Sequence, residues 1–287
     1  MPGDVGRHQA KRGIRPRRWR RTIRGCAAAL VLVVASTVTI RPGPAAVALG
    51  PEPVWRVGVA HPIVVVEGRC ARVTHVVALS VRIVADRPDG LPGALAAPAV
   101  PVRSPSEATA TSRAHAERFV TSVLGRSPTH RIVAGMFDGP SAGLAFALAL
   151  VEADLGPLAG SRVVAATGAI TPWGLVRPVG EVELKAAGAE MAEADLLVVA
   201  RHDADAAATW GRELIDLSGL DLSLAVGAAR RACRHWDGRP VVLAVHHAQT
   251  AGAFLCGATG STAACALAEA HVPQAGPLVP EPLLRGR

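Results

Sequence analysis

The chain has no tyrosine, and aromatic residues make up only 3% of its 287 residues. Outside the first 24 residues, the chain also lacks an excess of positive or negative charge. That segment holds nine basic residues and Asp4, whereas the other positions hold equal numbers of basic and acidic groups. The formal net charge of +8 therefore belongs to residues 1–24. Because the body carries no excess of positive charge, we expect no nucleic-acid partner.

Motifs for metals and nucleotides are missing as well. No C-x-x-C occurs, so the sequence gives no support for a zinc site, and we expect neither a metal nor a cofactor. The segment "GATGST" at 257–262 lacks the lysine of a phosphate-binding loop, so ATP-driven unfolding is not expected. The chain has five cysteines, Cys26, Cys70, Cys233, Cys256 and Cys265. The last four could form disulfides, but the sequence leaves their pairing open.

An uncharged stretch, residues 25–40, follows the basic tail of residues 1–24. In a helix it would rise about 24 Å, slightly less than the hydrocarbon core of a bilayer, which is about 30 Å thick. One interpretation is a cleaved signal sequence, for which "AVA" at 46–48 supplies a site. The other is a transmembrane anchor, which the nine basic residues favour. Both place the body outside the cytoplasm, after a linker at 41–52.

The body, residues 53–237, alternates β-rich and helical runs, and the pattern loosens in a C-terminal extension of unknown role, residues 238–287. Valine-rich runs at 54–60, 62–68 and 71–85 predict the first strands, and Ser106 is a candidate cap for a helix that ends at Leu124. Further strands are predicted at 129–137, 161–168 and 195–200, an extended piece at 174–180, and helices at 141–153, 181–194 and 203–215.

Ser141 stands between the predicted strand 129–137 and a long apolar helix. Backbone N–H groups at a helix start have no partner within the helix, so an oxyanion could be held there. Gly139 and Gly143 would let backbone and substrate approach closely. However, serine is also a favoured helix cap and Pro140 suits a turn, so a structural role for Ser141 remains open.

"GPSAG" also fits G-x-S-x-G, the nucleophile motif of α/β-hydrolases. An esterase of that kind would need an acid and then a histidine further along the chain. Asp216 or Asp221, followed by His246 or His247, could serve. Against this hypothesis, no oxyanion-loop motif such as HGGG precedes the serine.

Lys185 is the second candidate for catalysis, because the chain has only two lysines among 31 basic residues and Lys11 lies in the tail. A buried lysine can lose its proton, whereas arginine cannot. To act as a base, its pKa must fall from about 10.4 toward 7–8. The alternative is a surface helix pair with Glu181, whose charge would raise that pKa.

Two stretches together resemble a known family: "DGPSAGLAFALAL", and "ATGAITPWGLVRPVGEVELKAAGAEMAEADLLVVA" after a short gap. They are similar to the proteolytic domain of Lon-type serine proteases, and most of all to the membrane-anchored Lon-like proteases without an ATPase module. The resemblance implies Ser141 as nucleophile, Lys185 as general base and Thr167 as a hydrogen-bonding support of the amine. The motif around the serine comprises Gly139, Pro140, Ala142 and Gly143.

The resemblance also implies an α+β fold, with helices packed on small mixed sheets. It predicts an ATP-independent endopeptidase that cleaves unfolded or loosely structured polypeptides outside the cytoplasm, and it disfavours the esterase, because the family needs no histidine. Relatives commonly assemble into rings, which allows a homo-oligomer. Glu181 departs from the family, which usually has a glycine there. It raises the alternative of an inactive peptide-binding module in which Glu181 keeps Lys185 protonated.

Overall fold

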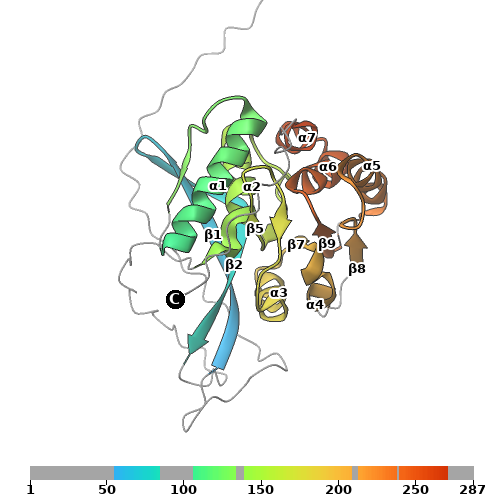
Figure 1. Ribbon diagram of the computed structural model, residues 1–287, viewed down its shortest axis with the longest axis horizontal. Coiled ribbons are helices and arrows are strands. Elements are labelled where there is room, and N and C mark those ends of the chain that lie inside the picture. Colours follow the sequence, from blue (N-terminus) through green and yellow to red (C-terminus); the bar gives the residue numbers. More distant parts are fainter. Residues whose placement is uncertain (1–54, 85–105, 134–138, 209–212, 238, 271–287) are drawn as a thin grey trace, which may run out of the picture. The chain divides into compact units, whose positions relative to one another are not determined.

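The computed structural model describes residues 55–84, 106–133, 139–208, 213–237 and 239–270 (Figure 1). The predicted basic tail, the apolar segment 25–40 and the linker 41–52 lie outside the described residues. Among the helices of the described ranges, none is both long and apolar enough to cross a bilayer.

A seven-stranded mixed sheet forms the centre of the described fold, in the order β3-β1-β2-β4-β7-β9-β8. Its first three strands pair antiparallel and the rest run parallel to β2. The strands are β1 (Trp55–Glu67), β2 (Cys70–Val84), β3 (Arg131–Ile132), β4 (Val164–Ala166), β7 (Leu196–Ala200), β8 (Glu213–Asp216) and β9 (Val241–Val245).

Two of the predicted strands are one. β1 continues through Pro62, where its pairing with β2 shifts register before Val64. Such an irregularity is where a sheet accommodates a proline, because the missing N–H then costs no ladder hydrogen bond. The proline therefore marks a bulge and not the end of a strand.

Helices cover both faces of the sheet (Figure 1). β7 shows this directly, because Leu196 and Val198 contribute to one core and Leu197 and Val199 to the other. A strand buried on both sides has no polar face, which explains its uninterrupted apolar sequence. The first core includes α1 (Glu107–Leu124), α2 (Gly143–Leu155), α5 (Leu222–Ala232), α6 (Ala248–Thr259) and α7 (Thr262–Glu269); the second includes α3 (Val182–Met191) and α4 (Ala204–Ala208).

The α+β class is confirmed, with a larger sheet than the small sheets predicted. A second, two-stranded sheet joins β5 (Ala169–Ile170) to β6 (Val176–Arg177). The predicted C-terminal extension contributes β9, which lies between β7 and β8 in the main sheet. The helix predicted at 203–215 is also shorter: α4 ends at Ala208, and Glu213–Asp216 forms the edge strand β8.

The start of α1 follows the sequence prediction closely. The Ser106 hydroxyl accepts the backbone N–H of Thr109 at 3.3 Å, which satisfies one of the unpaired donors of the first turn. The helix runs to Leu124 and ends at Gly125, whose φ of +66° is the left-handed conformation that glycine adopts readily.

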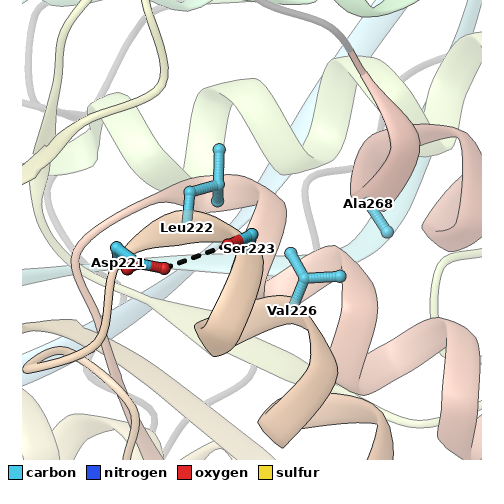
Figure 2. A pocket seen from close by; sticks show the side chains of 5 residues that line it. All are labelled: Asp221, Leu222, Ser223, Val226 and Ala268. Atoms are coloured by element: carbon cyan, nitrogen blue, oxygen red, sulfur yellow. Dashed lines mark hydrogen bonds between the residues drawn. The ribbon is translucent and has the colours of Figure 1, made fainter.

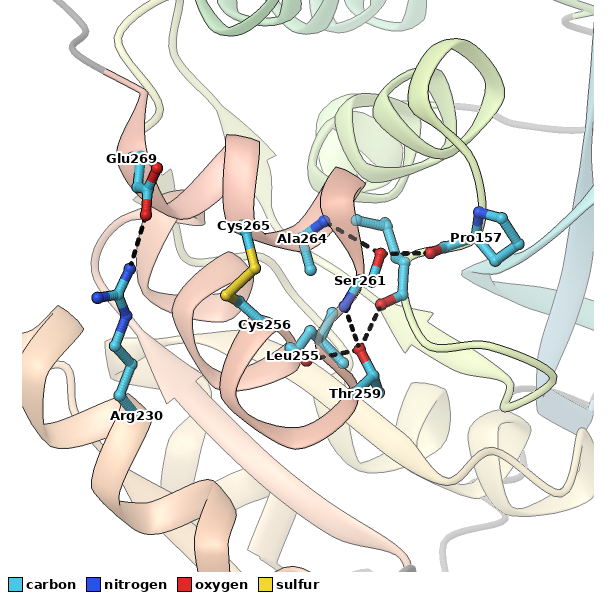
Figure 3. Close-up of a disulfide and its surroundings, with 10 residues drawn as sticks. Pro157, Arg230, Leu255, Cys256, Thr259, Ser261, Ala264, Cys265 and Glu269 are labelled. Atoms are coloured by element: carbon cyan, nitrogen blue, oxygen red, sulfur yellow. Dashed lines mark hydrogen bonds and ion pairs between the residues drawn. A yellow bond between two sulfur atoms is a disulfide. The ribbon is translucent and has the colours of Figure 1, made fainter. Parts of the chain in front are cut away.

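A disulfide between Cys256 and Cys265 joins α6 to α7 (Figure 3). The turn between the two helices is also attached to the end of α2, because Ser261 Oγ donates to the carbonyl of Pro157 at 2.5 Å. Thr259 Oγ1 donates to the neighbouring carbonyl of Leu158 at 3.3 Å. The disulfide and these hydrogen bonds fix the last helical pair of the described chain against the first core.

We expect the Cys256→Ser/Cys265→Ser double variant to lose about 2–3 kcal/mol of unfolding free energy, because the disulfide closes a loop of about ten residues in the unfolded chain. Urea denaturation monitored by circular dichroism measures the loss. The wild-type protein under reducing conditions should match the double variant. An unchanged transition midpoint in both would show that the hydrogen bonds of Ser261 and Thr259 suffice.

Candidate active site

Ser141 lies in a short 3-10 turn, η1 (Pro140–Ala142), which leads directly into α2. Gly139 precedes the turn with a φ of +86°, a conformation that glycine adopts at little cost. The Ser141 side chain caps neither the turn nor α2, whose N-cap is Ala142. The predicted position of Ser141 at a helix start is therefore correct, and its role as a cap is excluded.

A row of hydroxyls on α1 holds the loop in front of Ser141. Ser112 Oγ donates to the carbonyl of Pro140 at 2.9 Å, and Thr109 Oγ1 donates to the carbonyl of Gly139 at 3.4 Å. The Gly139 N–H in turn donates to Ser106 Oγ at 3.5 Å. Residues three apart share one face of a helix, so the spacing of these hydroxyls is a signal that sequence reasoning could have used.

Gly168, shortly after the end of β4, holds the same loop through its backbone. Gly168 N–H donates to the carbonyl of Ser141 at 2.9 Å, and the Gly168 carbonyl accepts the N–H of Leu144 at 3.0 Å. A Cβ on Gly143 would lie only 2.5 Å from Ser112 Oγ, so α1 and α2 can approach this closely only at a glycine.

Thr167 was predicted to support the lysine amine. In the structure its buried hydroxyl instead donates to the carbonyl of Ser141 at 3.5 Å. Its own N–H donates to Val198 of β7 at 3.0 Å. Thr167 thus connects the Ser141 backbone to the main sheet.

Lys185 is buried in the first turns of α3, with only 5% of its surface exposed. Its Nζ donates to the carbonyl of Gly180 at 2.7 Å. Burial lowers the pKa of Lys185 because the ammonium is poorly solvated, and the negative charge of Asp203 partly opposes this shift. The interpretation of Lys185 as a surface cation is therefore wrong.

Glu181 pairs with Arg56 of β1, and both side chains are partly exposed. Its φ of +63° is left-handed, a conformation that glycine adopts more readily than glutamate. The charge that acts on Lys185 is that of Asp203. The concern that Glu181 holds the lysine protonated is therefore not supported.

Asp203 was not among the predicted site residues. It lies in η2 (Arg201–Asp203), directly after β7, and only 5% of its surface is exposed. Its Oδ2 accepts the N–H of Val179 at 3.1 Å. Burial raises the pKa of Asp203, while the hydrogen bond from Val179 and the charge of Lys185 act in the opposite direction. The available signal was an acidic residue at the carboxyl end of a buried strand.

Residues 106–209, from α1 to the end of α4, match the family model of the Lon protease (S16) C-terminal proteolytic domain. The match supports a Lon-type proteolytic domain in this part of the chain. The match includes Ser141, Lys185 and Asp203, and it supports a serine peptidase. A comparison with curated proteins found no match. Within the described fold, the hairpin β1–β2 and the elements from β8 to α7 lie outside the matched range.

The acids and histidines of the esterase hypothesis lie beyond the matched Lon-type range, and the two acids accept other hydrogen bonds. Asp216 accepts the N–H and hydroxyl of Ser218, and Asp221 caps α5 by accepting the N–H of Leu224. His247 is half-buried, and burial lowers its pKa. No hydrogen bond or ion pair between described residues joins either acid to His246 or His247, so the structure gives this triad no support.

A surface pocket also lies outside the range of the Lon-type proteolytic domain. Figure 2 shows that it is formed by the start of α5 and the end of α7. Its lining residues are Asp221, Leu222, Ser223, Val226 and Ala268. No residue of the candidate site lines it. In the described ranges, no group of three or more His, Cys, Asp or Glu side chains could hold a metal ion.

Proposed function

We propose that the protein is an ATP-independent serine endopeptidase in which Ser141 and Lys185 form the catalytic dyad. The observation that carries the proposal is that Lys185 is buried and that burial lowers its pKa. The same Lon-type range contains Ser141, which lies at a helix start without capping the helix. Lowered lysine pKa values and buried ionisable groups are typical of catalytic sites.

The chemistry follows from these two side chains. The neutral Lys185 amine takes the proton of Ser141 Oγ while the oxygen attacks a peptide carbonyl. The backbone N–H groups of Ser141 and Ala142 in η1 are the proposed oxyanion donors, because those of Gly143 and Leu144 already donate to the carbonyls of Pro140 and Gly168. The lysine ammonium then protonates the leaving amine, and water hydrolyses the acyl-enzyme. A Cβ at Gly139 would meet nothing within 4 Å, whereas Gly143 lets α1 pack closely on α2, and Thr167 donates to the Ser141 carbonyl.

We also propose that the domain works outside the cytoplasm, attached to the membrane by residues 25–40 or released after signal cleavage. The basic tail in front of an apolar segment and the Cys256–Cys265 disulfide support this location. Since the sequence holds no phosphate-binding loop, the proposed substrates are unfolded or loosely structured polypeptides. Assembly into a homo-oligomer is part of the same proposal.

One observation favours a second candidate, an inactive peptide-binding module. Lys185 Nζ donates to the carbonyl of Gly180, and a carbonyl acceptor stabilises an ammonium. A lysine that stayed protonated throughout the working pH range could not activate Ser141. The two candidates predict the same fold and differ only in the reactivity of the serine.

A fluorophosphonate probe, which reacts with activated serines, separates the two candidates. We expect the full-length chain to be labelled at Ser141, as mapped by peptide mass spectrometry, and to cleave unfolded casein without nucleotide. Ser141→Ala should lose both properties, with turnover reduced by about 10³-fold or more. Ser223→Ala, at an exposed position on α5, is the control and should retain both. A folded protein that binds casein but leaves Ser141 unlabelled would establish the binding module.

A further inference from the structure

The proposed mechanism uses one of the two buried charges in the site and leaves the other, Asp203, without a role. Burying a carboxylate costs several kcal/mol unless it is paired or hydrogen-bonded. Here the carboxylate lies next to the element that carries the proposed base. The following inference rests on the proposed function, and its test includes a measurement that does not depend on activity.

The geometry joins Asp203 and Lys185 through two consecutive residues. Asp203 Oδ2 accepts the N–H of Val179, and the carbonyl of the next residue, Gly180, accepts Lys185 Nζ. The carboxylate and the amine are thus attached to the same short piece of backbone between β6 and α3. If Asp203 released Val179, the acceptor of the lysine amine would lose its anchor.

The charges around the pair come from two elements, α3 and η2. Lys185 responds to Asp203, and Asp203 responds to Lys185, His202 and Glu183. His202 and Glu183 are exposed, so water screens them, whereas Lys185 and Asp203 are both 5% exposed. The interaction between the two buried groups therefore dominates, and each group stabilises the charged form of the other.

We propose that Asp203 is a positioning residue of the peptidase. It anchors the Val179–Gly180 backbone that holds the Lys185 amine, and its negative charge favours the protonated form of this amine. Asp203 does not touch the substrate. It acts on the reaction only through Lys185.

Two substitutions separate the anchor from the charge. Asp203→Asn keeps an oxygen that can accept the Val179 N–H but removes the negative charge. Asp203→Ala removes both. Asp205→Asn is the matched control, because Asp205 is an exposed aspartate two residues further along, in α4.

The first measurement is the pH dependence of kcat/KM for casein with the full-length chain. Without the carboxylate, the Lys185 ammonium loses a favourable neighbour, so its pKa falls and the amine stays neutral to lower pH. The acid limb of the Asp203→Asn profile should therefore move to lower pH by about one unit or more. Asp203→Ala should show the same displacement and, because the backbone anchor is lost, a kcat/KM reduced by about ten-fold at every pH. Asp205→Asn should coincide with the wild type.

The second measurement titrates Lys185 directly. Because the chain contains only two lysines, ¹³Cε-lysine labelling gives two signals, and Lys185→Arg assigns them. In the Ser141→Ala background, Asp203→Asn should lower the titration midpoint of Lys185. An unchanged midpoint would overturn the inference, whether or not the protein is active. A lowered midpoint in a chain that never cleaves casein would instead refute the peptidase and leave the coupling of the two side chains established.

Discussion

Replacing Lys185 by arginine is expected to lower kcat/KM for unfolded casein by about 10³-fold, the typical contribution of a general base. Arginine keeps a long side chain and a hydrogen-bond donor at this position, but it also keeps its positive charge at every working pH. It cannot release its proton, and therefore cannot accept the proton of Ser141. Steady-state hydrolysis at several pH values measures the effect.

Lys11→Arg provides the control, because it makes the same change at the only other lysine, in the basic tail. It should leave turnover unchanged. A thermal melt of Lys185→Arg distinguishes lost chemistry from lost folding, and Lys185→Met serves as a second variant if the larger guanidinium does not fit. Wild-type turnover in a folded Lys185→Arg protein would contradict a lysine base.

Gly58→Ala is expected to destabilise the fold by about 3 kcal/mol and to reduce activity strongly. A Cβ on Gly58 would lie 1.6 Å from the carbonyl oxygen of Leu184, because α3 packs directly on β1 at this point. Backbone cannot move aside as a flexible side chain can, so α3 has to shift. Since Lys185 follows Leu184 in the chain, the shift would displace the proposed base.

Urea denaturation and casein hydrolysis together measure this effect. Gly219→Ala is the matched control, because a Cβ there meets nothing within 4 Å. It should change the unfolding free energy by no more than about 0.5 kcal/mol. A Gly58→Ala protein with the wild-type midpoint and activity would show that α3 does not pack on β1 as described.

The local signals of the sequence predicted the elements around Ser141 well. The cap at Ser106, the helix after the "GPSAG" motif and the apolar strand β7 all depend on residues close together in the chain. The edge strand β8 was predicted as helix, because its four residues alternate too briefly to show a strand period. The membership of β9 in the main sheet depends on pairing with distant strands, which no local pattern encodes.

The sequence could not predict which acidic residue acts on Lys185, because this too depends on contacts between distant parts of the chain. Glu181 is four residues from Lys185, so helix spacing suggested that these two would pair. The fold instead gives Glu181 to Arg56 and places Asp203 beside the lysine. Arg56 lies on β1 and Asp203 in η2, at distances along the chain that periodicity does not reach. Lys185 itself could be identified from the sequence, because lysine is rare in the composition and no contact has to be known to see this.

The two helix-borne groups of the proposed dyad belong to opposite layers of the molecule, since Ser141 leads into α2 of the first core and Lys185 is on α3 of the second. Between these layers, β4 presents Ala166 to one core and Ala165 to the other. Small side chains on both faces keep this strand thin. Bulkier residues there would widen the spacing of the two helices while leaving each helix intact. If Ser141 and Lys185 act together as proposed, the side chains of β4 are then under selection for their size as well as for their hydrophobicity.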